Sequence, residues 1–195
     1  MRIIAGELGG RSLKAPAGTG TRPSSARLRE GLASALDARG AIASARVLDL
    51  FAGSGALGLE ALSRGASALL AIDRDRRALR CIAENVQALG LRPRARWLSL
   101  DLFDAEVAAR RIAAAAEAPF ELVFADPPYA HVQAACALLM ELQRQGALAE
   151  DAIAVLEHPG DVELSPETLS LFELLPRRRY GDSAFSLAIA NALAS

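Results

Sequence analysis

The chain has 195 residues, of which 52% are hydrophobic and 23% charged, and its formal net charge is −1. This length predicts one domain whose core is large enough to fold without disulfides or a metal. The two cysteines, Cys81 and Cys136, lie far apart without a nearby His, which argues against a zinc site and favours a reducing compartment. No apolar run reaches the roughly 18 residues of a membrane span, so we expect a cytoplasmic protein without a signal peptide.

Charge is distributed unevenly along the chain. Residues 1–30 carry six basic and two acidic side chains, a net charge of +4, whereas the remainder carries 16 basic and 21 acidic ones, a net charge of −5. A basic segment on an acidic body indicates a polyanionic partner that is bound locally. Because the chain is rich in arginine throughout, the placement of the arginines is more informative than their number.

The first forty residues are predicted to form a basic arm that packs on a catalytic domain of residues 41–195. Residues 2–5 and 11–15 flank two glycines at 9–10, which predicts a short hairpin with its turn at the glycines. A linker rich in Gly, Pro and Thr follows. Ser24 or Ser25 can cap the next helix, whose leucines at 28, 32 and 36 recur every four residues.

From Arg46 onward, strands alternate with helices. Nearly continuous apolar strands with helices between them predict a mostly parallel sheet covered on both faces. The last two apolar runs lie too close together for an intervening helix, which predicts a closing antiparallel hairpin. We expect helices near 56–64, 76–89, 104–116 and 131–145, and seven strands at 47–51, 68–72, 94–100, 120–125, 153–157, 171–175 and 184–190.

Residues 47–58 are predicted to form a strand, a glycine turn and the start of a helix. Gly53 and Gly55 allow a tight turn and a close approach of ligand to backbone, and a helix N-terminus presents free N–H groups. With Gly58 they match the dinucleotide fingerprint, and Asp73 ends the next strand, where ribose hydroxyls are bound. A nicotinamide-dependent oxidoreductase is therefore one hypothesis, and a turn that only packs helix on strand is another.

Asp49 favours a different cofactor. S-adenosylmethionine carries a cationic amino group and a sulfonium but no phosphate, so its site benefits from a carboxylate beneath the glycine loop. The spacing from Asp49 through Phe51 to the glycines resembles motif I of amino-methyltransferases, in which this acid helps to hold the methionine end. Asp101, at the end of the third strand, could accept a hydrogen bond from the adenine amine, with Leu102 or Phe103 against the ring, or could cap the following helix.

The most informative motif is Asp126-Pro127-Pro128-Tyr129, which ends the apolar run of residues 120–125. Proline fixes φ and has no backbone N–H, so this stretch offers an amine the Asp126 carboxylate and backbone carbonyls as acceptors. Tyr129 offers a ring on which a base could stack. The combination favours methyl transfer to a planar amine, and a Pro-rich turn without a catalytic role is the alternative.

Together these motifs resemble the class I methyltransferases, which implies a Rossmann-like α/β fold and S-adenosylmethionine as cofactor. More narrowly, the chain is similar to the bacterial RsmD family over nearly its whole length, on Arg2-Ile3-Ile4-x-Gly6, Gly10-Arg11-x-Leu13, Thr21-Arg22-Pro23, Arg27-x-Arg29-Glu30, residues 51–66 and Tyr180-Gly181-Asp182. That family methylates N2 of one guanine in small-subunit ribosomal RNA. The resemblance implies 16S rRNA, within the small subunit or an assembly intermediate, as the partner of a monomeric enzyme. Ala26 departs from the pattern, in which an acidic residue is expected before Arg27.

The implied chemistry is an in-line displacement of the sulfonium methyl group by guanine N2. Asp126 and the Pro127 carbonyl would accept the amine hydrogens and favour a pyramidal nitrogen, acting by positioning and electrostatics more than by base catalysis. The target base must be unpaired or flipped, with Tyr129 as its stacking surface. Phosphate contacts that set affinity are expected from the basic side chains of the arm, Arg11, Lys14, Arg22, Arg27 and Arg29.

Three alternative functions remain at this stage. An adenine-N6 methyltransferase of DNA or RNA uses the same four residues, 126–129, although the chain has no insertion of the size of a target-recognition segment. An NAD-dependent oxidoreductase would use the glycines and Asp73. An RNA-binding assembly factor without catalytic activity would tolerate loss of the Asp126 carboxylate.

Overall fold

The computed structural model describes residues 1–16 and 26–192. The chain divides into two compact units, Met1–Leu100 and Asp101–Ser195. The predicted domain boundary between residues 40 and 41 falls inside the first unit, which therefore holds the arm together with the glycine loop. Among the helices in the described part of the chain, none combines the length and apolar character that crossing a bilayer requires.

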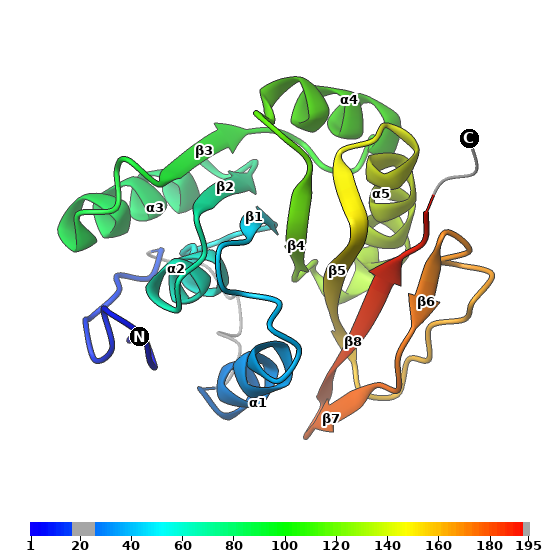
Figure 1. Ribbon diagram of the computed structural model, residues 1–195, viewed down its shortest axis with the longest axis horizontal. Coiled ribbons are helices and arrows are strands. Elements are labelled where there is room, and N and C mark those ends of the chain that lie inside the picture. Colours follow the sequence, from blue (N-terminus) through cyan, green and yellow to red (C-terminus); the bar gives the residue numbers. More distant parts are fainter. Residues whose placement is uncertain (17–25, 193–195) are drawn as a thin grey trace. The chain divides into compact units, whose positions relative to one another are not determined.

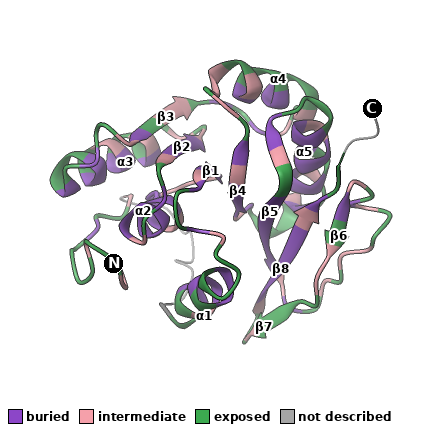
Figure 2. Ribbon diagram, in the orientation of Figure 1, coloured by how far each residue is buried: buried purple, intermediate pink, exposed green. Residues whose placement is uncertain are grey.

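The first unit is built on three parallel strands in the order β3-β2-β1 (Figure 1). Strands β1 and β2 are buried along most of their length, in agreement with their continuous apolar runs (Figure 2). Helix α2 contacts β1 and β2, and α3 contacts β2 and β3. The elements of this unit are α1 (Ala26–Asp37), β1 (Arg46–Leu50), α2 (Ala56–Ser63), β2 (Ala68–Asp73), α3 (Arg76–Leu89) and β3 (Ala95–Ser99).

Helix α3 begins and ends where its sequence predicts. The side chain of Asp75 accepts a hydrogen bond from the backbone N–H of Arg77, and Gly90 ends the helix in the left-handed region at φ 71°. Between these caps, Ile82, Val86 and Leu89 are buried. These residues are spaced by three and four positions, so they form one apolar stripe on the helix, which contacts β2 and β3.

The arm forms the predicted antiparallel pairing over a short length. An isolated bridge joins Arg2 and Ser12, and the N–H of Gly10 donates to the carbonyl of Ile3 at 2.9 Å. The turn begins earlier than predicted, at Gly6, whose carbonyl accepts from the N–H of Gly9 at 3.1 Å. The predicted linker after Pro16 and the caps Ser24 and Ser25 lie outside the described residues.

The second unit has five described strands, four in the order β4-β5-β8-β6 and a fifth, β7, that also pairs with β8. Strands β4 and β5 are parallel, and the pairs that involve β8 are antiparallel, which confirms the predicted closing hairpin. The described residues form eight strands where seven were predicted, because residues 178–180 pair with β8 as an additional short strand. These strands are β4 (Phe120–Ala125), β5 (Leu148–Pro159), β6 (Phe172–Leu174), β7 (Arg178–Tyr180) and β8 (Ser183–Ala190).

The predicted acceptor motif, residues 126–129, lies at the end of β4, and helices of the second unit pack near it. Helices α4 (Ala105–Ala115) and α5 (Val132–Arg144) contact each other, and α5 packs on β5 (Figure 1). A single 3-10 turn, η1 (Tyr129–His131), joins the end of the motif to α5. The motif therefore lies between a buried strand and a helix that packs on the neighbouring strand.

Candidate functional site

The glycine loop of the first unit makes a tight turn directly after β1. Phe51, Gly53 and Gly55 all have positive φ, at 58°, 55° and 76°. The turn is closed by the N–H of Gly55, which donates to the carbonyl of Ala52 at 2.7 Å, and α2 begins at the next residue. The predicted glycines thus serve a turn that ordinary residues rarely adopt.

Asp49 lies beneath this loop, as predicted, and braces the start of α2. Its carboxylate is 2% exposed, and its Oδ2 accepts a hydrogen bond from the N–H of Gly58 at 3.0 Å. A Cβ at Gly58 would lie 2.5 Å from Cδ1 of Leu69 and 3.0 Å from Asp49 Oδ2. Glycine at 58 therefore lets α2 approach the strand, and Asp49 places a negative charge where the first turn of the helix presents N–H groups.

Asp73 joins the glycine loop to the end of β2. Its Oδ2 accepts from the N–H of Gly53 at 2.9 Å, and its Oδ1 accepts from the N–H of Asp75 at 2.8 Å. A carboxylate has about four lone-pair sites, so both oxygens keep capacity for a ligand hydroxyl. The structure thus ties the predicted Asp73 to Gly53 of the loop, and the predicted Asp49 to Gly58 at the start of α2.

Asn85 of α3 is a site residue that the motifs did not identify. It is 2% exposed, and its Nδ2 donates to the carbonyls of Ser54, inside the glycine loop, and Lys14, in the arm, at 3.0 and 3.1 Å. Its Oδ1 accepts from the N–H of Lys14 at 2.8 Å. The signal available in the sequence was an amide at helical spacing from Ile82 and Leu89, on the apolar face of α3. Asn85 therefore holds the glycine loop and the arm at once.

Backbone groups of the arm are held by the C-terminal half of α2. The buried carboxylate of Glu60 accepts from the N–H groups of Ile4 and Ala5, at 2.7 and 3.1 Å. Gly6 has a φ of 84°, and a Cβ there would lie 1.9 Å from the carbonyl oxygen of Ser63. Only glycine therefore lets the arm lie this close to α2.

The arm's basic side chains differ in how available they are to a phosphate. Lys14 pairs with Glu84 at 2.8 Å, and that hydrogen bond raises the pKa of Lys14 and lowers the pKa of Glu84. Arg11 is exposed and donates to the carbonyl of Ala88 at 2.9 Å, and Arg27 is exposed. The predicted Arg22 lies outside the described residues.

Arg29 corrects the prediction of a surface phosphate contact. Its side chain is 5% exposed and its Nη1 donates to the carbonyl of Arg2 at 3.2 Å. Burial lowers the pKa of Arg29, and within the described residues its Nε has no hydrogen-bond partner. The guanidinium therefore binds the backbone of the arm, and because it is buried it is not available at the surface.

In the second unit, the acceptor motif begins at the end of β4. Asp126 is half-buried, Pro127 is buried and Pro128 is exposed. The carbonyl of Pro128 accepts from the N–H of His131 at 2.7 Å, which starts the 3-10 turn η1. Among the described residues no donor reaches the Pro127 carbonyl. The Pro127 carbonyl is therefore available to an amine, next to the Asp126 carboxylate in the chain.

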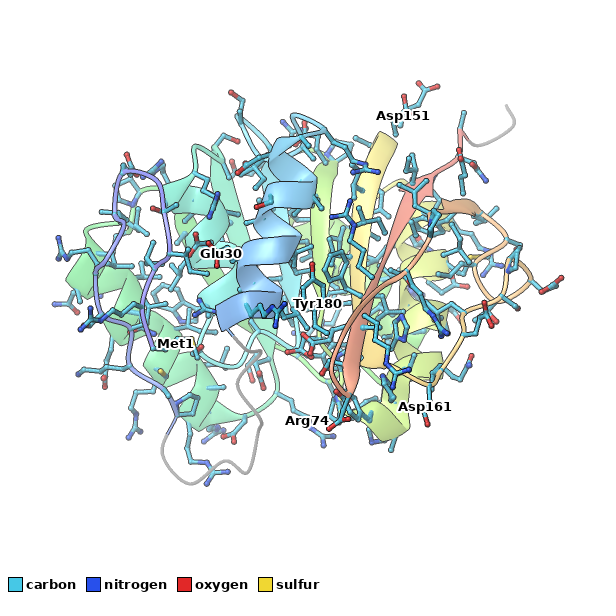
Figure 3. The ribbon with its side chains drawn as sticks, turned by 90° about the horizontal axis from the view of Figure 1, so that it is seen from below. Met1, Glu30, Arg74, Asp151, Asp161 and Tyr180 are labelled. Atoms are coloured by element: carbon cyan, nitrogen blue, oxygen red, sulfur yellow. The ribbon has the colours of Figure 1, made fainter. Side chains whose placement is uncertain are left out.

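Tyr129 has a partly exposed ring whose hydroxyl is held by a hydrogen bond. Its side chain is 42% exposed, and its hydroxyl forms a 2.6 Å hydrogen bond with Oγ of Ser183, the first residue of β8. Ser183 directly follows the Tyr180-Gly181-Asp182 stretch (Tyr180 is labelled in Figure 3). The motifs did not identify Ser183, and its position after that stretch was the one available signal. The hydrogen bond restricts the orientation of the ring while leaving part of it open to solvent.

The loop after β3 lies beside the acceptor motif. Asp101 is exposed and its Oδ1 accepts from the N–H of Phe103 at 3.0 Å, whereas the cap of α4 is Asp104, whose Oδ1 accepts from Val107 at 3.1 Å. The alternative that Asp101 caps the helix is therefore wrong, because Asp104 has that position. The rings of Phe103 and His131 lie 4.3 Å apart, so this loop and residues 129–131 are adjacent. The predicted Leu102 is 3% exposed and packs in the core.

His158 is a buried titratable group at the end of β5. Its Nδ1 lies 2.9 Å from the carbonyl of Pro159 and its Nε2 lies 2.9 Å from Oγ of Ser186. Since a carbonyl only accepts, Nδ1 carries the proton and Nε2 accepts from the serine hydroxyl. Burial lowers the pKa of His158, so the neutral ring is favoured in the folded state.

Comparison with known proteins places these features in a family. The family model described as "Conserved hypothetical protein 95" matches residues 1–189. YlbH of Bacillus subtilis (strain 168) is 40% identical over 183 residues, which are 93% of this chain and 94% of YlbH. Ribosomal RNA small subunit methyltransferase D of Escherichia coli (strain K12) is 37% identical over 161 residues, 80% of this chain and 74% of the relative. The solved structure of yhhF from Escherichia coli superposes with a TM-score of 0.78 at 32% identity over 99% of both chains, and this likeness confirms the predicted Rossmann-like α/β fold.

Proposed function

The chain belongs to the RsmD family of class I methyltransferases, and from its two clusters of site residues we propose that it methylates the exocyclic N2 amine of a guanine in small-subunit ribosomal RNA. The observation that carries this proposal is the acceptor motif after β4. It offers a carboxylate and a proline carbonyl beside a partly exposed aromatic ring whose hydroxyl is fixed by Ser183. A planar amine attached to a stacking ring is the substrate class that such a site fits.

S-adenosylmethionine is the methyl donor, and the donor set around the glycine loop fits it. Asp49 already accepts a hydrogen bond from the N–H of Gly58 in the first turn of α2, and its negative charge would repel the pyrophosphate of a dinucleotide. The same charge favours the cationic amino group of S-adenosylmethionine. This geometry supports the methyl donor over the nicotinamide alternative.

Within the proposed site, several groups would hold the donor. Asp73 would bind the ribose hydroxyls, and Asp101 the adenine amine. Gly53, Gly55 and Phe51 would shape the turn around the methionine end. When bound, the donor supplies an electrophilic methyl group on its sulfonium.

The acceptor side of the reaction depends on Asp126 and the Pro127 carbonyl. Both would accept hydrogen bonds from the guanine amine and turn its lone pair toward the methyl group. Positioning and fixed charge of this kind contribute more than proton removal, because an ordinary aspartate is a weak base. After transfer the nitrogen is strongly acidic, and its proton passes to the Asp126 carboxylate or to water.

Basic residues of the arm would bind the RNA backbone and set the affinity for RNA. The proposed contacts are Arg11, Lys14, Arg22 and Arg27. Arg29 is left out of this set, because it is buried. The enzyme would act as a monomer in the cytoplasm, on 16S rRNA in the small subunit or in an assembly intermediate.

The test is methyl transfer from labelled S-adenosylmethionine to small subunits, protein-free rRNA and duplex DNA, followed by mapping of the modified base. We expect N2-methylguanine in the rRNA. Asp126→Ala should lower kcat by at least about a hundredfold, the loss typical of a removed transition-state contact, with near-normal cofactor affinity. Methylation of adenine, or of DNA alone, would contradict the substrate assignment. An equal loss of cofactor affinity would show that Asp126 serves the donor instead.

A further inference from the structure

The strand β7 carries a charged surface that the proposed mechanism does not use. We propose that the β7–β8 hairpin (residues 178–186) is an RNA-contact surface in which Arg178 binds a phosphate that flanks the base stacked on Tyr129. This inference rests on the proposed function, because it assigns a backbone contact to the same nucleic acid whose base Tyr129 would hold.

Tyr129 is attached directly to this hairpin. Its hydroxyl lies 2.6 Å from Oγ of Ser183, and Ser183 is paired with Tyr180 across the β7–β8 turn. Any nucleotide that stacks on Tyr129 therefore has the hairpin next to it.

Arg178 lies on the same face of the hairpin as this attachment point. It is paired with Phe185, two residues along from the Tyr180 and Ser183 pair, and side chains two apart on a strand share a face. The ring contact between Tyr180 and Phe185, with centroids 5.7 Å apart and planes at 15°, agrees with that placement. Two residues of strand span about 7 Å, so Arg178 lies a short distance along the hairpin from the Tyr129 anchor.

The guanidinium of Arg178 is available for a ligand. Arg178 is exposed, and no residue in the described part of the chain forms a hydrogen bond or ion pair with its side chain. Two other arginines of this unit, Arg110 and Arg144, differ, because they are paired with Glu106 and Glu141 at 3.1 and 2.5 Å. An unpaired arginine fork suits the bidentate geometry of a phosphate.

The residues on either side of Arg178 add to the positive charge and are held in place. Arg177 donates from Nη1 to the carbonyl of Val162 at 2.6 Å, and Arg179 donates from Nε to the carbonyl of Gly181 at 3.0 Å. The stem of Arg179 lies over Gly160, where a Cβ would come within 2.8 Å of its Nε. Each contact uses one of the five N–H donors of its guanidinium, so both arginines keep further donors.

The experiment compares Arg178→Ala with Arg111→Ala, because Arg111 is an exposed arginine of α4 in the same unit whose side chain likewise has no partner among the described residues. RNA affinity is measured with protein-free small-subunit rRNA at several salt concentrations, and S-adenosylmethionine affinity and kcat at saturating RNA are measured in parallel. Arg178→Ala should weaken RNA binding about fivefold at low salt, the upper end for an exposed ion pair. It should also lower the salt slope by about 0.7, the value for one single-strand phosphate.

Cofactor affinity and kcat should stay unchanged in both variants, and Arg178→Lys should recover part of the loss. Equal RNA affinity and salt slope for the Arg178→Ala and Arg111→Ala proteins would overturn the proposal, as would a loss of kcat without a loss of affinity. Failure of the proposed function is a separate result. In that case the unaltered protein would bind S-adenosylmethionine but transfer no methyl group to rRNA.

Discussion

The hydrogen bond between Tyr129 and Ser183 allows the ring and the hydroxyl of the proposed base platform to be tested separately. Tyr129→Phe keeps the ring and removes the hydroxyl that lies 2.6 Å from Ser183 Oγ. A protein hydrogen bond contributes about 0.5–1.5 kcal/mol, and water can replace this one because the side chain is 42% exposed. We therefore expect Tyr129→Phe to lose about 0.5–1 kcal/mol of RNA-binding free energy, which corresponds to a two- to fivefold rise in the KM for RNA.

Tyr129→Ala removes the ring as well. Stacking of one base on an aromatic side chain contributes about 1–3 kcal/mol, so the total loss in kcat/KM should lie between about tenfold and several hundredfold. Ser183→Ala removes the same hydrogen bond from the other side and should match Tyr129→Phe. In the double variant, the second change should add little, because both remove one interaction.

The assay is steady-state methyl transfer to rRNA, with the affinity for S-adenosylmethionine measured in each variant as a control that should not move. If Tyr129→Phe were as damaging as Tyr129→Ala, the hydroxyl and not the ring would be the group that matters. If Tyr129→Ala retained the kcat/KM of the unaltered protein, Tyr129 would not be the platform. Additive losses in the Tyr129→Phe and Ser183→Ala pair would show that the two groups act independently.

Two further predictions follow from buried polar groups. Asn85→Ala should raise the dissociation constant for S-adenosylmethionine about tenfold, because the Ser54 carbonyl in the glycine loop loses its donor. The control, Glu84→Gln, removes only the exposed pair with Lys14 and should leave this constant unchanged. Calorimetric titration measures both variants, and equal affinities would contradict the role of Asn85. Because burial lowers the pKa of His158, the unfolded chain binds more protons than the folded one below about pH 6.5, so stability should fall as pH drops from about 6.5, by at most about 1.4 kcal/mol per pH unit. His158→Phe should remove this part of the slope in urea unfolding at pH 7 and pH 5.5, and an unchanged slope would show that another group is responsible.

Much of the fold follows from local patterns. Continuous apolar runs identified β1, β2 and β4 to within a residue or two, and Asp75 and Gly90 marked the ends of α3. These features depend on near neighbours, so they can be recognised in a linear sequence. The additional strand β7 escaped prediction because two of its three residues are arginines, so it shows no apolar alternation, and only pairing with β8 defines it as a strand.

Residues that support the site from a distance in sequence could not be predicted in this way. Ser183 meets Tyr129 across 54 positions, and Asn85 meets Ser54 across 31. Neither type of side chain marks a function by itself, and each becomes informative only when its partner is known. The choice between Asp101 and Asp104 as helix cap was different, since an N-cap bonds to the residue two or three positions further on and spacing from the helix start could have favoured Asp104.

The arginines in the first turn of α1 show that a count of charges does not tell which side chains are exposed, whereas their helical spacing does. Arg27 and Arg29 were both predicted to contact phosphate, although residues two apart on a helix point in nearly opposite directions. Arg29 precedes Leu32 by three positions and Leu36 by seven, which places it on the apolar stripe, and the structure buries it while leaving Arg27 exposed. Lys14 in turn has a carboxylate partner. A basic arm therefore provides fewer phosphate contacts than its sequence implies, and the cations to test for RNA binding are those that the fold leaves both exposed and unpaired, Arg178 before the rest.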